Sequence, residues 1–442
     1  MTDLTGALDG VLAMQRAGEE IEVYGVHRQV TTIQAETGGA IRQVDQSETL
    51  GIGVRLIKGH RTGYASTSDF GKAGLTRCVE QARSHAELSK SHPTNKLAAP
   101  AIALPANTSL AAGPVVLAER LAVATDLARY ATAMDRRVRV IDSATYRDER
   151  STVEIAATTG LRVQHERSFV ELWVDVIGDH GSITASGSGY QWVPQHADCD
   201  PRRIAAEAVG QAVRLLGPGV EVPADAPILC SPDVAAAFIA AAGRALVAPL
   251  VGSGRGPLAG GIGSTAGSPI VTLIDDGLHP TSKRSGPFDD EGVARQTTPL
   301  VRKGIVSGML QSTATTRDDE ASTGNAYRGS YKSVPDIAPT TLVLEPTASV
   351  SELMSAPGDL VYVQQMTGER SGISAVSGRV DIAVAGYVLR DGEPAGAFAA
   401  VPVSTTVREV LHAVEAVGDD ARPVFGSPVL APTLRLAAGW LA

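Results

Sequence analysis

The stretch "IQAETGGAIRQ", residues 33–43, recurs further along the chain as "IAATTGLRVQH", residues 155–165. Each copy has an apolar segment that enters a Thr-Gly turn and an extended segment that leaves it, which is typical of a β-hairpin. The segments "YASTSDF" (64–70) and "TASGSGY" (184–190) match in the same way. The offset between the copies is 122 residues at the first match and 120 at the second. We therefore interpret the first half of the chain as a duplicated unit.

Helical patterns flank the strands of both copies. Their apolar residues recur at intervals of three and four, which favours amphipathic helices. The segments are Leu4 to Arg16, Gly71 to Leu88, Val115 to Thr132 and Pro201 to Gly217. The Pro- and Ala-rich segment 91–114 has no clear period and is interpreted as a surface linker between the copies. Residues 1–220 are thus predicted to form an N-terminal α/β domain with a duplicated helix–strands–helix unit.

The second half begins with a strand and the segment "SPDVAAAFIAAAGRALVAPL", residues 231–250. Ser231 suits a helix N-cap and Pro232 the first helical position. This helix is apolar on nearly all sides, which predicts that it is buried. From Pro269 onward the chain alternates short strand-like runs with turns, and one predicted helix, from Thr405 to Val417, interrupts them. The predicted fold class is α+β, with a mainly β C-terminal domain over residues 221–442.

Composition excludes several classes of partner. The formal net charge is −9 and aromatic residues make up 4% of the chain, which argues against a nucleic-acid-binding surface. The sequence has no uninterrupted apolar run of membrane-spanning length, so no membrane partner is expected. The three cysteines are few and far apart, which fits a reducing compartment and predicts a cytoplasmic protein.

An acidic triplet is the most conspicuous candidate for chemistry. Asp289, Asp290 and Glu291 stand between a Pro-Phe step and Gly292. Such carboxylates can bind Mg²⁺ or Ca²⁺, act as acid and base, or shape a loop. We favour the loop, because the spaced ligands of an EF-hand are absent. The sequence also contains no HExxH zinc motif and no G-x-S-x-G nucleophile motif.

The order of motifs over residues 220–442 resembles the TldD/PmbA (TldD/TldE) family. The motifs are "PFDDEGVARQTTPLVRKGIVSGML", "STGNAYRG", "LVLEP", "VDIAVAGYVLRDGEPAG" and "GSPVLAPTLRLAAG". The duplicated first half is similar to the first domain of that family, so the resemblance covers nearly the whole chain. It implies a metalloprotease assembly in which zinc-binding, TldD-like chains carry an HExxxH helix and a C-terminal cysteine as ligands.

This chain departs from that zinc motif at every position. The resemblance aligns Ile239 and Ala240 with the first His and the Glu, and Arg244 with the second His. An aliphatic side chain cannot coordinate a metal, and a guanidinium stays cationic. No cysteine follows Cys230. The resemblance therefore points to the metal-free, TldE/PmbA-like branch, with no catalytic or metal-binding residue and no cofactor in this chain.

The resemblance also implies partners. A TldD-like subunit would supply zinc in a heterodimer, or two copies of this chain would form a homodimer, and the substrate would be an unfolded peptide or an amide-bearing biosynthetic intermediate. A stand-alone homodimeric hydrolase and a metal-free peptide-binding module are the alternatives. Two short stretches are candidates for the cleft or the subunit interface: Asp289, Asp290, Glu291 and Gly292 in the first, and Ser322, Thr323, Gly324 and Asn325 in the second.

Overall fold

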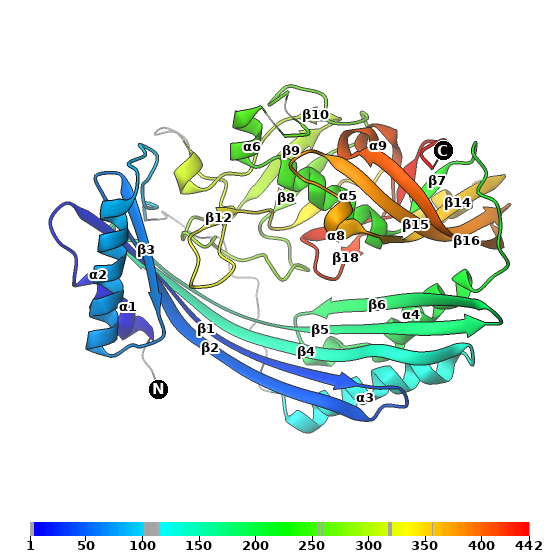
Figure 1. The fold of residues 1–442 in the computed structure, drawn as a ribbon, viewed down its shortest axis with the longest axis horizontal. Helices are drawn as coiled ribbons and strands as arrows, with labels where there is room; N and C mark the ends of the chain where they lie inside the picture. Colours follow the sequence, from blue (N-terminus) through cyan, green and yellow to red (C-terminus); the bar gives the residue numbers. More distant parts are fainter. Residues whose placement is uncertain are drawn as a thin grey trace.

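The computed structural model describes residues 4–100, 104, 113, 115–254, 256–258, 260–316, 321–355 and 357–441. A long, curved antiparallel sheet with helices on one face forms the N-terminal half, and the C-terminal half lies over the opposite face (Figure 1). This mixed architecture confirms the predicted α+β class. Of the helices formed by the described residues, none is long and apolar enough to cross a membrane.

The first sheet joins both copies of the repeat. Its strand order is β3-β2-β1-β4-β5-β6, and all neighbours are antiparallel. The central pair β1–β4 joins the two copies. The order of a helix, three strands and a helix occurs twice in succession, which confirms the predicted duplicated helix–strands–helix unit. The strands are β1 (Glu19–Ala35), β2 (Ile41–Lys58), β3 (Arg61–Thr67), β4 (Val138–Ala157), β5 (Arg162–His180) and β6 (Ile183–Val193).

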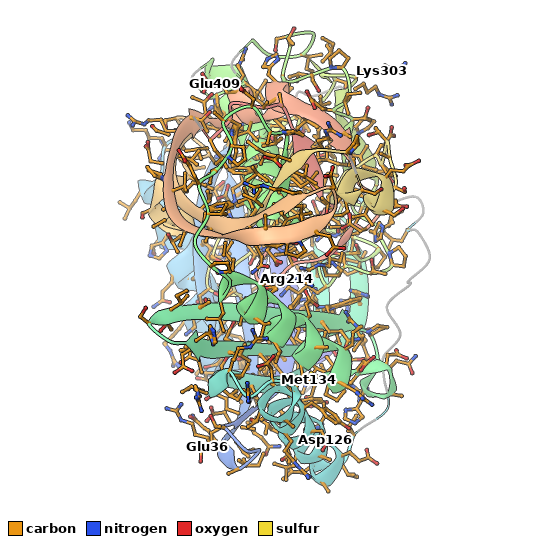
Figure 2. The ribbon with its side chains drawn as sticks, turned by 90° about the vertical axis from the view of Figure 1, so that its right-hand side faces the viewer. Glu36, Asp126, Met134, Arg214, Lys303 and Glu409 are labelled. Atoms are coloured by element: carbon orange, nitrogen blue, oxygen red, sulfur yellow. The ribbon has the colours of Figure 1, made fainter. Side chains whose placement is uncertain are left out.

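Helices cover one face of this sheet at its two ends. The helices α1 (Leu4–Leu12) and α2 (Lys72–Leu88) pack on the first copy, while α3 (Leu117–Met134) and α4 (Pro201–Leu215) pack on the second. Figure 2 shows the helices α3 and α4 side by side, with Arg214 of α4 nearer to the C-terminal half than Met134 of α3. The segment 101–114 of the predicted surface linker lies mostly outside the described residues, but Leu97 and Ala98, which precede it, are buried.

In each copy, a glycine of the outer strand lets a helix approach that strand closely. A Cβ added at Gly63 would lie 1.8 Å from the carbonyl oxygen of Ala82 in α2. A Cβ at Gly187 would lie 2.1 Å from the carbonyl oxygen of Ala208 in α4. Both distances are far below van der Waals contact, so only glycine fits. The repeat is therefore a repeat of packing as well as of strand order.

The C-terminal half contains two six-stranded sheets, of order β16-β15-β14-β7-β20-β17 and β10-β9-β8-β13-β19-β18. The main helix, α5 (Pro232–Ala245), packs against strands of both sheets and is buried as predicted. The other strands of the first sheet are β7 (Ile228–Cys230), β14 (Asp359–Thr367), β15 (Arg379–Arg390), β16 (Glu393–Thr406), β17 (Val414–Val417) and β20 (Leu434–Leu436). Those of the second are β8 (Leu273–Asp276), β9 (Thr297–Arg302), β10 (Ile305–Val306), β13 (Leu342–Leu344), β18 (Arg422–Pro423) and β19 (Val429–Ala431).

Short elements complete this half. They are α6 (Ala248–Ser253), α7 (Val350–Met354), α8 (Glu369–Gly372), α9 (Val407–Ala413) and the two-stranded pair β11 (Ala326–Tyr327) and β12 (Asp336–Ile337). The predicted mainly β character is confirmed. The boundary predicted between residues 220 and 221 falls in the segment between α4 and β7, and the division into two independently folding domains stays a prediction.

Candidate functional site

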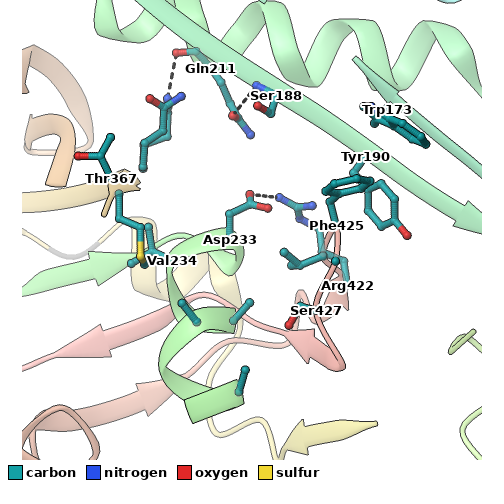
Figure 3. A pocket seen from close by; sticks show the side chains of 18 of the residues that line it. Trp173, Ser188, Tyr190, Gln211, Asp233, Val234, Thr367, Arg422, Phe425 and Ser427 are labelled. Carbon is teal, nitrogen blue, oxygen red and sulfur yellow. Dashed lines mark hydrogen bonds and ion pairs between the residues drawn. The ribbon is translucent and has the colours of Figure 1, made fainter. Parts of the chain in front are cut away.

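A cavity of about 790 Å³ lies where the second copy of the repeat meets α5. We call it the α5 cavity. The N-terminal half contributes β5, the edge strand β6 and α4, and the C-terminal half contributes α5, β14 and the segment 424–428. Figure 3 shows these walls, with Ser188 and Gln211 on one side and Val234 and Ser427 on the other. The cavity is large enough for several residues of a peptide.

The helix α5 begins at a Ser231 cap and presents small residues to this cavity. Ser231 accepts a hydrogen bond from the backbone N–H of Val234 at 3.3 Å, and this cap fixes where the helix begins. Further along the helix, Ile239 points into the core and is 1% exposed. Ala240 and Arg244 line the cavity instead. The three positions aligned with a zinc motif thus divide between the core and the cavity.

Arg244 is a cation of this cavity that has no carboxylate partner among the described residues. Its side chain is exposed, and it makes no hydrogen bond or ion pair with any residue that the structure describes. Another arginine of the same cavity, Arg422, is fully engaged, at 2.6 Å from Asp233 and 3.0 Å from Glu207. A guanidinium without a carboxylate partner is available to an anionic group of a ligand.

Aromatic rings form an apolar wall across the cavity. The ring of Phe425 lies 5.1 Å from that of Trp173 and 5.4 Å from that of Tyr190. Phe425 is still 54% exposed, so this surface is accessible to a ligand. Trp173 and Tyr190 are cross-strand neighbours on β5 and β6. The rings add apolar contact area beside the unpaired charge of Arg244.

The edge of β6 offers backbone groups to the same cavity. The N–H of Ser188 donates to the side-chain oxygen of Gln211 at 3.1 Å, and the carbonyl oxygen of Ser186 accepts from the side-chain amide of Gln365 at 2.7 Å. Side-chain amides therefore occupy positions where a neighbouring strand would form ladder hydrogen bonds. An extended peptide can replace such side chains by adding to the sheet edge.

The acidic triplet lies elsewhere, in a buried loop between the halves. Asp289 accepts three backbone hydrogen bonds, from Glu291 at 2.9 Å, Val293 at 3.0 Å and Ala326 at 2.9 Å. Burial and the neighbouring Glu291 raise the pKa of Asp289, while these backbone donors oppose that shift. Gly292 follows with φ of +81°, a conformation that favours glycine. Asp289 and Gly292 thus shape the loop.

Glu291 belongs to a buried chain of charges that crosses between the halves. We call Glu22, Arg55, Glu291 and Arg328 the Glu22 network. Arg55 donates to Glu291 at 2.7 Å and to Glu22 at 2.6 Å, and Arg328 donates to Glu22 at 2.5 Å. Each of the four residues is at most 5% exposed. The guanidinium of Arg328 also lies 5.0 Å from the ring of Tyr24.

Asp290 completes the connection, because its carboxylate accepts from the backbone N–H of Arg328 at 2.6 Å. The charges of the triplet are therefore engaged within one chain. Arg55 holds the pKa of Glu291 down against the effect of burial. The triplet joins the two halves, and a role for it at a subunit interface or in a substrate cleft stays a prediction.

The second predicted stretch lies close to that loop and is also structural in its contacts. The hydroxyls of Ser322 and Thr323 both donate to the carbonyl oxygen of Gln311 at 3.1 Å. Asn325 is buried and donates to Asp275 at 2.6 Å. A Cβ at Gly324 would lie 2.6 Å from the carbonyl oxygen of Ala294. None of these residues lines the α5 cavity.

Fold and motifs together define a chain of the metallopeptidase type, and three family models match it. They are the PmbA/TldA metallopeptidase domain 1 over residues 21–86, the central domain over residues 112–216 and the C-terminal domain over residues 223–438. The chain belongs to the PmbA/TldD family.

The chain is also similar to several known proteins. A metalloprotease TldD homolog of Haemophilus influenzae is 27% identical over 78% of this chain and 72% of its own length. A metalloprotease of Methanothermobacter thermautotrophicus is 24% identical over 88% of this chain and 86% of its own. Among solved structures, TldE from Thermococcus kodakarensis superposes with a TM-score of 0.81, at 19% identity over 98% of both chains. A Thermotoga maritima protein whose name refers to modulation of DNA gyrase gives 0.89, at 22% identity over 98% of this chain and 99% of its own.

The residues of this chain do not fit the zinc ion that the family implies. Ile239 is aliphatic and enclosed by the core, and Arg244 offers only donors and a positive charge. Within the described residues, no group of three His, Cys, Asp or Glu side chains is arranged to hold a metal. The α5 cavity offers aromatic rings, backbone groups of β6 and the guanidinium of Arg244.

The sequence interpretation did not identify the aromatic wall or the β6 edge. A signal for part of it was present in "HERSFVELWVDV", residues 165–176, where alternation places His165, Arg167, Phe169, Glu171 and Trp173 on one face of a strand. Phe425 could not be found in this way, because it reaches Trp173 from a segment more than 200 residues away, as the numbering shows.

Proposed function

We propose that this chain is a metal-free, TldE-like subunit of a TldD/TldE-type peptidase, and that it binds an extended peptide in the α5 cavity. A TldD-like partner supplies the zinc ion in the resulting heterodimer. The single observation that carries the proposal is that α5 lacks metal ligands at the positions aligned with the zinc motif. The helix retains its buried position beside a large cavity, while Ile239, Ala240 and Arg244 offer no metal ligand.

The contacts of the cavity favour a peptide over a compact metabolite. The edge of β6 provides backbone pairing at Ser186 and Ser188, which is sequence-independent. The wall of Trp173 and Phe425 accepts apolar side chains. A folded protein would not reach strand-pairing positions inside a cavity, so the ligand is an unfolded segment.

Co-expression with a TldD-like chain that contains HExxxH tests the proposal. We expect light scattering to show a heterodimer that contains zinc only when the TldD-like chain is present. The heterodimer should hydrolyse an unfolded peptide, and a chelator should abolish that hydrolysis. We expect the isolated chain to bind the same peptide, without hydrolysis and without stoichiometric zinc.

Two other outcomes would replace the proposal. Chelator-resistant hydrolysis by the isolated chain would establish a stand-alone, homodimeric hydrolase. Peptide binding with no gain in hydrolysis after addition of the TldD-like chain would establish a metal-free binding module. Tightly held zinc in the isolated chain would contradict the chemistry assigned to α5.

A further inference from the structure

A second cavity, of about 250 Å³, lies between the two halves and is surrounded by cations. We call it the arginine cavity. Its floor is the face of β1, β4 and β5 that is opposite to the helices, and its roof comes from the C-terminal half, around residues 283–290, 326–329 and 338–340. Seven of its lining side chains are Arg or Lys, and two are carboxylates.

Three of these cations have carboxylate partners outside the cavity lining, because Arg147 and Lys283 pair with Glu171 and Arg328 pairs with Glu22. Glu149 is shared by Arg28 at 3.3 Å, Arg147 at 2.6 Å and Arg167 at 3.7 Å. Arg167 has no other carboxylate within ion-pair distance among the described residues, and its hydrogen bonds go to the hydroxyl of Ser151 and the carbonyl oxygen of Lys283. The positive charge around Arg167 is thus only partly compensated.

Arg284 has no carboxylate partner among the residues that the structure describes. Its guanidinium donates to the carbonyl oxygen of Pro339 at 3.3 Å and lies 5.1 Å from the ring of Tyr327. Burial lowers the pKa of Arg284, and the charges of Arg244, Arg295 and Arg167 lower it further. Arg244 is the free guanidinium of α5, so Arg284 stands among positive charges from both cavities.

Uncompensated like charges repel strongly where water is partly excluded. The positive charge of Arg295 is better compensated than that of Arg284, because Arg295 lies near enough to the buried Asp275 and Asp289 to lower their pKa values. His165 adds no charge at neutral pH, since burial, with Arg167 and Arg295, lowers its pKa to about 4. The remaining excess is centred on Arg284 and Arg167.

We propose that the arginine cavity binds a compact oxyanion of the carboxylate or phosphate class, held by Arg284 and Arg167. Planar guanidinium groups match the two oxygens of a carboxylate or phosphate in bidentate fashion. The cavity has room for about eight waters at roughly 30 Å³ each, so it accepts a small ion or the end of a longer molecule.

The oxyanion can be a free ion or a carboxylate of a peptide. A peptide could reach both cavities, because strand β5 lines both of them. Trp173 in the α5 cavity and Arg167 in the arginine cavity lie on the same face of β5, six residues and roughly 20 Å apart along the strand. A peptide carboxylate and inorganic phosphate are therefore the two sources to distinguish. The inference concerns the isolated chain and does not depend on a zinc partner.

Calorimetric titration of the full chain, at constant ionic strength, tests the site. The probes are inorganic phosphate and a short peptide prepared with either a free C-terminal carboxylate or a C-terminal amide. The wild-type chain is expected to bind phosphate, the free-acid peptide or both, and Arg284→Gln to weaken that binding about ten-fold, the loss of one charged bidentate contact. Arg139→Gln, an equal charge change at an exposed pair with Asp179, is expected to leave binding unchanged.

Each outcome decides the proposal. Binding of phosphate alone identifies a free anion, and binding of the free-acid peptide but not its amide identifies a peptide carboxylate. Absence of saturable binding by both probes, or equal affinity of wild type and Arg284→Gln, overturns the site. If Arg284→Gln does not fold, as judged by circular dichroism, Arg284→Lys replaces it. That variant keeps the charge without the planar fork and is expected to bind more weakly than wild type, and unchanged affinity would contradict the assigned geometry.

Discussion

The Glu22 network and the α5 cavity use arginine in opposite ways. In the network, Arg55 and Arg328 are buried and every guanidinium faces a carboxylate. In the cavity, Arg244 is exposed and has no partner among the described residues. A buried pair is costly to break but adds little function, whereas an unpaired charge in a cavity is free to meet a ligand. The difference separates residues that hold the halves together from residues that bind.

The largest expected effect is on the network. Glu22→Gln leaves the buried Arg328 without a carboxylate partner and leaves Arg55 with Glu291 alone, and we expect it to lower the free energy of unfolding by about 3–5 kcal/mol. Urea denaturation measures this change. Glu166→Gln, in an exposed pair with Arg150 at 3.9 Å, is the matched control and is expected to change it by less than about 0.5 kcal/mol. Equal effects of both variants would contradict a structural role for the network.

Substitutions in the loop that contains Asp289 and Asp290 are expected to cause smaller losses of stability. Asp289→Asn keeps one acceptor oxygen for the N–H groups of Glu291 and Val293 but places its NH₂ group against the N–H of Ala326, so we expect a loss of about 2 kcal/mol from the unsatisfied donors at that position. Asp290→Asn keeps an acceptor for the single backbone N–H of Arg328 and should cost less than about 1 kcal/mol. Thermal unfolding compares the two variants, and a reversed order would show that Asp289 does not organise the loop.

His165, which lines the arginine cavity, makes the stability of the chain depend on pH. Its pKa is lowered from 6.5 to about 4 in the folded chain, first by burial and then by Arg167 and Arg295. The unfolded chain therefore binds a proton at a higher pH than the folded chain. Stability is fully present above pH 6.5 and falls as pH drops toward 4, by on the order of 1–2 kcal/mol after solvent screening.

Urea denaturation across that pH range, for wild type and His165→Gln, measures this effect. The variant should lose less stability than wild type as the solution is acidified, because it has no imidazole to titrate. A parallel decline in both proteins would assign the pH dependence to other groups.

The smallest expected change in stability is at Arg244. Because its side chain has no partner among the described residues, Arg244→Ala should alter the free energy of unfolding by less than about 0.5 kcal/mol. Peptide affinity should fall about ten-fold if Arg244 meets a charged group of the ligand. Fluorescence anisotropy with a labelled peptide measures the affinity. A large loss of stability with unchanged affinity would place Arg244 with the structural arginines instead.

Local chemistry made much of the fold predictable. The capping residues Ser231 and Pro232 gave the start of α5, and its apolar composition gave its burial. Alternation and turns gave the strands of both repeat copies. The predicted helix from Thr405 to Val417 was too long, because the segment from Val414 forms β17, which pairs with β20. That pairing depends on a distant strand and leaves no local signal.

The candidate site was predictable only in part. Ile239, Ala240 and Arg244 could be identified as degenerate positions, since a missing ligand is visible in the sequence. The partner of Glu291 could not, because Arg55 lies 236 residues earlier in the chain. Nor could the unpaired state of Arg244 and Arg284 be known, since the absence of a partner is a property of the folded surroundings. The sequence shows which residues are charged, but only the folded structure shows which of those charges are paired.

The central β1–β4 pair has a consequence for synthesis on the ribosome. Strand β1 is complete at Ala35, but β4 is complete only at Ala157, 122 residues later. At about 5–20 residues per second, β1 waits roughly 6 to 24 seconds with one hydrogen-bonding edge uncovered. A nascent chain with a 17-residue open edge can join the same edge of a neighbouring chain. Overexpression should therefore favour inclusion bodies, and a slower rate of translation initiation or a chaperone that shields β1 should reduce them.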